Sequence, residues 1–169
     1  MTQAALKVAQ SNEKVSTGID KEARKKIAEA LSAVLTDTYF LVIKSHIYHW
    51  NVVGPMFHAI HEMSEEQYEN MFAAADDIAE RIRALGHHAP IADASGPAQA
   101  AVSPMTGART AQEMVQDLID DHEAAIRKMR DAAELAEGEN DFVSHDLLVE
   151  RMTYHEKVVW MWRSLITEK

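Results

Sequence analysis

Histidine and carboxylate side chains recur at one-turn spacing along the middle of the chain, in a pattern that could bind a metal cation. His61 and Glu65 are four residues apart, and so are Asp76 and Glu80, which places each pair on one face of a helix. His49 lies near the end of the preceding helical stretch. Mixed imidazole and carboxylate ligands suit ferrous iron and leave positions open for an oxidant. We therefore expect a metal site that uses these side chains.

The two pairs are too far apart to serve one cation from a single helix. Asp76 follows His61 by 15 residues, which is about 22 Å along a helix axis. Either the pairs form two unrelated sites, or symmetry presents the acidic pair of one subunit to the histidines of another. The second alternative predicts an obligate oligomer.

A solvated charged helix face is the competing interpretation of any such pattern. An ordinary ferritin site also needs Glu-x-x-His motifs that face the inside of one bundle. None of the nine histidines in this chain has a glutamate three residues before it. The sequence therefore disfavours a di-iron centre within one subunit.

Hydrophobic periodicity predicts two long helices around these residues. Asp20 can cap the first helix, whose apolar side chains recur every three or four positions to about Trp50. After a short turn, a second periodic stretch runs from about Phe57 to Leu85, where Gly86 is placed to end it. Two long helices joined by a short loop form an antiparallel hairpin.

A long crossover separates this hairpin from a third helix. The segment 87–109 contains three prolines and two glycines, so it is too irregular for one long helix, although 97–102 could form a short one. Thr110-Ala-Gln-Glu113 has the pattern of a capping box. We expect the third helix to begin there and to end near Gly138.

A fourth periodic stretch, from about Asp141 to Thr167, completes an all-α protein. Short links within each helix pair and one long crossover between the pairs are the topology of a ferritin-like four-helix bundle. With 47% hydrophobic residues, the chain can build one proper core. We expect a flexible N-terminal tail over 1–19 and one bundle domain over 20–169.

Composition favours cations over nucleic acid as partners. The chain has 27 acidic and 17 basic residues, and it has no cysteine for disulfides or thiolate chemistry. The negative charge repels phosphate backbones and anionic membranes. The N-terminus lacks the pattern of a signal peptide, and no apolar run approaches the ~20 residues of a membrane span. We expect a cytoplasmic protein with no membrane partner.

Part of this sequence resembles the ferroxidase signature of the Dps family, the mini-ferritins. The matching residues are HWNVVG at 49–54, Phe57, HEM at 61–63, Asp76 and AERI at 79–82. With the helix order, the crossover and the stretch 155–163, the resemblance covers nearly the whole chain after the tail. It implies a bundle that assembles into a hollow homo-dodecameric shell.

The resemblance also implies where iron binds and what happens to it. His49, His61 and residue 65 of one subunit would join Asp76 and Glu80 of its two-fold mate in an intersubunit di-iron site. There Fe(II) would be oxidised to Fe(III), preferably by hydrogen peroxide, and stored as mineral, which protects the cell from oxidative damage. The family usually has aspartate at position 65, so the extra methylene of glutamate puts the iron affinity in question. Zinc is a candidate competitor.

Neighbouring residues have two interpretations each. Trp50 and Tyr48 could reduce or shield oxidising species beside the iron, although aromatic side chains at a helix end usually pack. Only Trp50 belongs to the signature, and we place it near the site. His46 and His58 lie one turn before the two site histidines, as extra ligands or as polar neighbours.

Further acidic residues resemble those with accessory roles in the family. Glu62 and Glu66 could nucleate mineral, or they could belong to a solvated acidic face. Asp141, Asp146 and Glu150 resemble the residues that line the three-fold pores through which iron enters. Asp141 could instead only cap the fourth helix.

The alternative function is a DNA-binding, nucleoid-condensing shell protein with a weak or inactive ferroxidase centre. Some relatives use a lysine-rich flexible terminus against phosphates. Here the tail offers Lys7 and Lys14, with Glu13 between them. We expect weak or no DNA binding, so that any association with the nucleoid would be loose.

Overall fold

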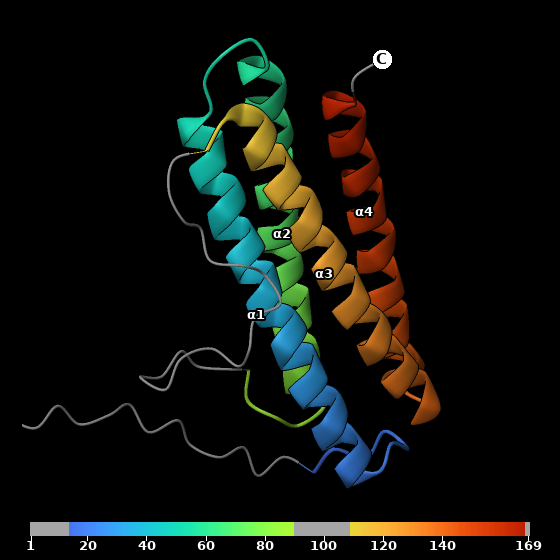
Figure 1. Cartoon of the computed structure of the whole chain (residues 1–169). Helices are drawn as coiled ribbons and strands as arrows, with labels where there is room; N and C mark the ends of the chain where they lie inside the picture. Colours follow the sequence, from blue (N-terminus) through green and yellow to red (C-terminus); the bar gives the residue numbers. More distant parts are fainter. Residues whose placement is uncertain (1–13, 90–108, 168–169) are drawn as a thin grey trace, which may run out of the picture.

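The structure is a computed structural model that describes residues 14–89 and 109–167. Within these residues the regular secondary structure consists of helices alone, as the hydrophobic pattern predicts (Figure 1). Most of the expected tail and the expected short helix at 97–102 lie outside the described residues. The helices are α1 (Lys21–Asn51), α2 (Phe57–Ala84), α3 (Ala111–Gly138) and α4 (Phe142–Ile166).

Local capping chemistry explains where two of these helices begin. The side chain of Asp20 accepts a hydrogen bond from the backbone N–H of Glu22 at 2.8 Å and so caps α1. At the start of α3, Thr110 and Glu113 each accept a hydrogen bond from the other's backbone N–H, which confirms the predicted capping box. Both helices therefore begin within a residue of the predicted positions.

Left-handed residues explain where α2 and α3 end. Gly86 has φ +87°, a conformation that glycine adopts without strain, and the next N–H, of His87, bonds back to the carbonyl of Ile82. After α3 the corresponding residue is Asn140, with φ 60°. The N–H of Asp141 then bonds to the carbonyl of Ala136 at 2.8 Å. Asparagine tolerates this region better than most side chains, and α3 itself ends at Gly138, as predicted.

The helices form two antiparallel hairpins, α1 with α2 and α3 with α4, that pack mainly through α1 and α3 (Figure 1). The interface is apolar, as the periodicity of each helix requires. Its most buried side chains include Leu31, Leu41, Ile78, Leu118 and Trp162.

Buried charges also link α1 to α3. Lys44 on α1 is 4% exposed and pairs with Asp117 and Asp121 on α3. Lys128 pairs with the buried Asp37 at 2.6 Å. A buried ion left without its partner is costly, so these pairs help to fix how α1 and α3 are aligned. In the described part of the chain, no helix combines the length and apolar character needed to cross a membrane.

Candidate metal centre

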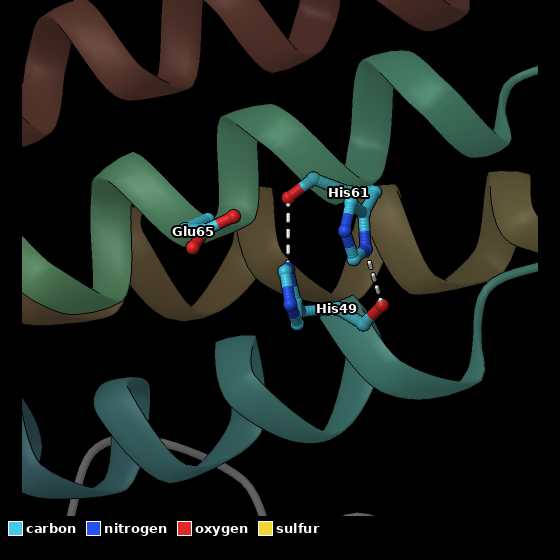
Figure 2. A group of neighbouring side chains, drawn as sticks. All are labelled: His49, His61 and Glu65. Carbon is cyan, nitrogen blue, oxygen red and sulfur yellow. Dashed lines mark hydrogen bonds between the residues drawn. The ribbon is translucent and has the colours of Figure 1, made fainter.

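His49 and His61 face each other across the α1–α2 hairpin and are tied together by two reciprocal hydrogen bonds (Figure 2). The Nδ1 atom of His49 lies 2.9 Å from the backbone carbonyl oxygen of His61. The Nδ1 atom of His61 lies 3.1 Å from the carbonyl oxygen of His49. The rings stack with centroids 3.8 Å apart. Each histidine is therefore held by the backbone of the other.

This arrangement determines which ring nitrogens are available. A carbonyl oxygen accepts hydrogen bonds but cannot donate them, so each Nδ1 must carry the hydrogen and act as the donor. In a neutral imidazole the lone pair is then on Nε2. Histidines that bind metals commonly donate the opposite N–H to a backbone carbonyl, which fixes ring orientation and tautomer. Both histidines are thus prepared to bind a cation through Nε2.

Glu65 completes a group of three potential ligands. One ligand atom from each of His49, His61 and Glu65 lies within 4.8 Å of the others. Among the described residues, it is the group of three side chains whose positions could hold a metal ion. Figure 2 shows Glu65 one turn beyond His61 on the same side of α2, as the four-residue spacing predicts. Two imidazoles and a carboxylate suit Fe(II), and also Zn(II).

The short link between α1 and α2 places these side chains opposite each other. The N–H of Val52 bonds to the carbonyl of Tyr48, and the Val52 side chain is buried in the core. Gly54 follows with φ +103°, which a residue with a side chain would adopt only with strain. Its carbonyl accepts a hydrogen bond from the N–H of Phe57, where α2 begins. The turn thus reverses the chain within a few residues of His49.

Three aromatic side chains pack beside the ligands. The ring of His46 stacks on Tyr68, with centroids 4.2 Å apart, and lies tilted against Trp50, with centroids 4.1 Å apart. Tyr68 also meets His49 edge-on, at 5.4 Å. Trp50 is therefore next to the site through His46, although its side chain is 62% exposed. Sequence reasoning did not single out Tyr68, although it lies three residues after Glu65 on the same helix face.

Tyr68 lies among the carboxylates that follow His61 on α2. Loss of hydration, and then the negative charges of Glu65 and Glu69, raise the pKa of Tyr68 above its usual value. The phenol consequently remains a hydrogen-bond donor at neutral pH.

Tyr48 packs into the core, as we expected of an aromatic side chain at a helix end that is not part of the signature. Its side chain is 1% exposed, and its hydroxyl donates a hydrogen bond to Asp117 on α3 at 2.5 Å. Burial, and then this hydrogen bond, raise its pKa. Tyr48 is two residues from Trp50 but points into the core, because residues two apart on a helix face different directions. It is a core residue and not a neighbour of the metal ligands.

Asp76 and Glu80 are exposed on α2. They belong to the same broad face of the helix as His61 and Glu65, but the group of converging ligands does not include them. His58 is also exposed and lies near Glu62, at 3.9 Å, in a pair that is charged only when the imidazole is protonated. The subunit therefore presents part of the predicted ligand set in one place and the rest at a distance.

The residues considered for mineral nucleation lie on the surface. Glu62 and Glu66, together with Glu65, line a shallow surface hollow of about 350 Å³. Asp146 and Glu150 are exposed on α4.

Asp141 differs from these exposed residues because it is buried and caps α4 through the N–H of Ser144. Its carboxylate also receives a hydrogen bond from Arg81 at 2.6 Å. Burial alone would raise its pKa, but the bonds from Arg81 and Ser144 outweigh burial and lower it. The structure thus shows the capping role that we considered as the alternative for Asp141, and its carboxylate is not free to line a pore.

A second histidine pair lies inside the bundle, between α3 and α4. His122 and His155 are both fully buried, with their Nδ1 atoms 2.8 Å apart, so one ring donates to the other. Both Nε2 atoms are buried, and neither has a hydrogen-bond partner among the residues that the structure describes. Burial first, and then the charge of Arg151, lowers the pKa of His122 to about 3. Burial, His122 and Arg151 also lower the pKa of His155.

Comparison with known proteins agrees with this architecture. The sequence profile of the ferritin-like domain matches residues 28–169. A low temperature-induced protein of Nostoc sp. is 38% identical over 156 residues, which are 90% of this chain and 87% of that protein. DNA protection during starvation protein 2 of Bacillus anthracis is 32% identical over 145 residues, 85% of this chain and 99% of that protein. The fold and the matching profile define a ferritin-like four-helix bundle.

Solved structures identify the family more narrowly. The Dps protein of Vibrio cholerae O1, described as one of the ferritin-like diiron-carboxylate proteins, matches with a TM-score of 0.82 and 28% identity, over 93% of this chain and all of that one. Dps from Thermosynechococcus elongatus matches with a TM-score of 0.81 and 27% identity, over 88% and 95% of the two chains. The chain belongs to the Dps family, as the signature residues indicate.

Proposed function

We propose that this protein is a ferroxidase and iron-storage protein whose di-iron sites form between two subunits. The observation that carries the proposal is the pair of imidazoles oriented by reciprocal backbone bonds, with Glu65 beside them. One subunit supplies few carboxylates to this group, whereas iron oxidation at a di-iron site needs more oxygen ligands to neutralise two ferric ions. Asp76 and Glu80 of the partner subunit would supply them.

The register of α2 supports this two-fold arrangement. His61 precedes the midpoint between residues 70 and 71 by as many residues as Glu80 follows it. The same is true of Glu65 and Asp76. If two copies of α2 pack antiparallel about a two-fold axis at that midpoint, the axis brings both carboxylates to the partner's ligands together. Two equivalent sites would result.

The surface around this midpoint has the apolar character of an interface. Phe72 on α2 is 62% exposed, and Ile43 and Tyr39 on α1 are also exposed. Apolar residues that lie together on a helix face in a subunit commonly become buried in an assembly. We infer that this face is covered by a second copy, and that further contacts build the dodecameric shell implied by the Dps fold.

The chemistry follows from two ferrous ions held together. Each Fe(II) gives one electron, and hydrogen peroxide takes two: two Fe(II), one H2O2 and two protons give two Fe(III) and two molecules of water. Because both electrons come from iron at one site, peroxide is reduced without release of hydroxyl radical. The oxidised iron then moves inward as ferric mineral, for which Glu62 and Glu66 provide exposed carboxylates.

Mixing two inactive variants tests the intersubunit site. His61→Ala removes a ligand from one side of each site, and Asp76→Ala removes a ligand from the other side. Each variant shell alone is expected to lose rapid peroxide-dependent iron oxidation, followed by near-ultraviolet absorbance after anaerobic loading with ferrous iron. A mixed dimer of the two variants contains one intact site, so an equal mixture reassembled together should regain about a quarter of the wild-type activity.

Asp77→Ala is the matched control, because Asp77 is the adjacent exposed carboxylate and is turned about 100° further around α2. It should oxidise iron at the wild-type rate. Size exclusion checks assembly of every variant. An unchanged rate in Asp76→Ala would contradict the proposal, as would two inactive variants that stay inactive after mixing despite forming mixed shells.

Removal of iron and peroxide also explains how such a protein could protect DNA, as the name of the Bacillus anthracis relative indicates for that protein. Since this chain carries a formal net charge of -10, we expect protection without strong DNA binding, in the cytoplasm. A gel shift at ~150 mM salt tests this point. Saturable retardation of duplex DNA at sub-micromolar protein would favour the nucleoid-condensing alternative.

A further inference from the structure

A groove of about 460 Å³ lies between the middle of α3 and the C-terminal half of α4, two helices that run side by side in Figure 1. Its apolar lining comes from Ile126 on α3 and from Val159 and Trp160 on α4. The Trp160 side chain is 65% exposed. A tryptophan can bury about 150–250 Å² of surface, so this one leaves a large apolar area in contact with water. Such a surface is typical of a protein interaction site.

The walls of this groove are rich in arginine. Arg130 pairs with Glu156 at 3.1 Å, and Arg163 pairs with Glu123 at 2.5 Å, so both ion pairs bridge α3 and α4. Arg127 also lines the groove and is exposed, and no carboxylate of the described residues forms an ion pair with it. The groove is therefore slightly positive, in a chain whose formal net charge is -10.

A second copy of this chain is the occupant that fits these properties. Acidic subunits repel one another, so an assembly of them needs positive contact points where a neighbour's carboxylates can bind. Tryptophan and arginine are also the residue types that contribute most binding energy at the centres of protein interfaces. Duplex DNA would be attracted by the arginines as well, but it would meet two glutamates in the groove and the negative charge of the rest of the chain.

The proposed shell requires such a contact in addition to the two-fold one. A contact about a two-fold axis joins a surface to its own copy, so it produces a pair of subunits and then stops. The two-fold face inferred above lies on α1 and α2, at Tyr39, Ile43 and Phe72. The groove is lined by residues within 123–130 and 156–167, on the other hairpin. It can therefore join one pair to the next.

We propose that this groove, the Trp160 groove, is the heterologous contact that joins two-fold pairs of the protein into a shell. Trp160 packs against a neighbouring copy, and Arg127 faces carboxylates of that copy. The inference rests on the proposed function, from which it takes the two-fold pair and the shell. It predicts that the contact at the groove can be broken while the pair, which holds the metal sites, remains.

Trp160→Glu tests the contact, because it removes the indole and places a negative charge in the groove. We expect particles of two chains in place of the shell, an about sixfold fall in mass measured by analytical ultracentrifugation, with unchanged helix content by circular dichroism. Arg127→Glu should raise the protein concentration needed for assembly by about tenfold. Trp160→Phe keeps an apolar contact and should assemble like wild type. Lys25→Glu reverses an exposed cation on α1, outside the groove, and should also assemble like wild type.

Iron oxidation separates this inference from the proposed function. Two-chain particles should keep the rapid peroxide-dependent oxidation, because the metal sites lie within the pair, but they should not hold the ferric mineral in solution. Shells of wild-type mass formed by Trp160→Glu would overturn the inference, as would its separation into single chains or a wild-type protein that forms pairs alone. If that variant kept the shell but lost a DNA retardation shown by wild type, nucleic acid would be the occupant instead. Two-chain particles without rapid oxidation would contradict the intersubunit metal site and leave the contact at the groove supported.

Discussion

The two histidine pairs of this protein join the same residue types across two equivalent helix hairpins, but their chemical surroundings are opposite. His49 and His61 donate Nδ1–H to backbone carbonyls and keep Nε2 available beside Glu65. His122 and His155 bond to each other through Nδ1 and are fully buried near Arg151. The two pairs therefore differ in what they offer a cation: only His49 and His61 have their Nδ1–H groups bound to backbone carbonyls and a carboxylate beside them.

The largest expected difference between the pairs is in metal binding. His61→Ala should weaken Co(II) or Zn(II) binding by at least about 100-fold, since it removes an imidazole ligand, although the backbone carbonyl of residue 61 can still accept the hydrogen bond from His49. Equilibrium titration of the apo shell measures this. His58→Ala, which removes an exposed histidine one turn away, serves as the control and should bind like wild type. Comparable losses in both variants would mean that the pair has no special role.

The buried pair should affect stability instead. His155→Leu leaves Nδ1 of His122 buried without its partner, which costs about 1–3 kcal/mol. Replacement of both histidines by leucine removes both polar groups, so the double variant should be more stable than either single variant. Denaturant unfolding measures the free energies, and metal affinity should not change. A double variant that is less stable than both single variants would contradict this account.

The buried pair should also make folding sensitive to mild acid. Because the folded-state pKa values of His122 and His155 lie below the usual value of about 6.5, the unfolded chain takes up protons that the folded chain does not. Their contribution to stability is thus present above pH 6.5 and is lost as the pH falls toward 3, by at most about 1.4 kcal/mol per pH unit for each histidine.

Unfolding measured between about pH 7 and 5 tests this effect, because most carboxylates become protonated only at lower pH. The wild-type free energy of unfolding should fall over this range, and the double leucine variant should show a shallower dependence. Equal slopes in the two proteins would assign the acid sensitivity to other groups. The His49–His61 pair is excluded as the source of the acid sensitivity if His61→Ala and wild type show the same slope.

The smallest expected effect concerns Glu62 and Glu66, the exposed carboxylates near the His49–His61 pair. Glu62→Gln with Glu66→Gln should slow later mineral growth by less than about tenfold, because nearby negative charge raises the local cation concentration. The first, rapid oxidation should be unchanged, since neither residue belongs to the ligand group. Stopped-flow absorbance for the first phase and scattering for the second separate the two. Loss of the rapid phase would place these glutamates within the site.

Most of the helix boundaries could be predicted because they depend on local chemistry. The Thr110 capping box and the glycine after α2 act within one turn, so the sequence contains the whole cause. The left-handed Asn140 after α3 was not foreseen as such, since asparagine also occurs at many positions that have negative φ. Four-residue spacing led to His61 and Glu65 on a common face of α2, and the family signature joined His49 to them.

Contacts between side chains of different helices could not be predicted from the sequence in this way. The sequence placed Tyr48 and Trp50 near one helix end, but only packing shows that Tyr48 turns toward Asp117 on α3. The stack of Tyr68 on His46 joins two helices, and it depends on how they are rotated about their axes. Periodicity gives the buried face of each helix but not which residues of two faces meet.

The sequence by itself therefore determined the four helices, their caps and the spacing that gathers histidine and carboxylate on α2, because each of these depends on residues within about one turn. Only the tertiary structure decided that His49 and His61 bind each other's carbonyl oxygens, whereas His122 and His155 bind each other. The physical reason is that packing of the whole bundle decides which side chains of different helices meet. That packing depends on many small contacts between residues far apart in the sequence.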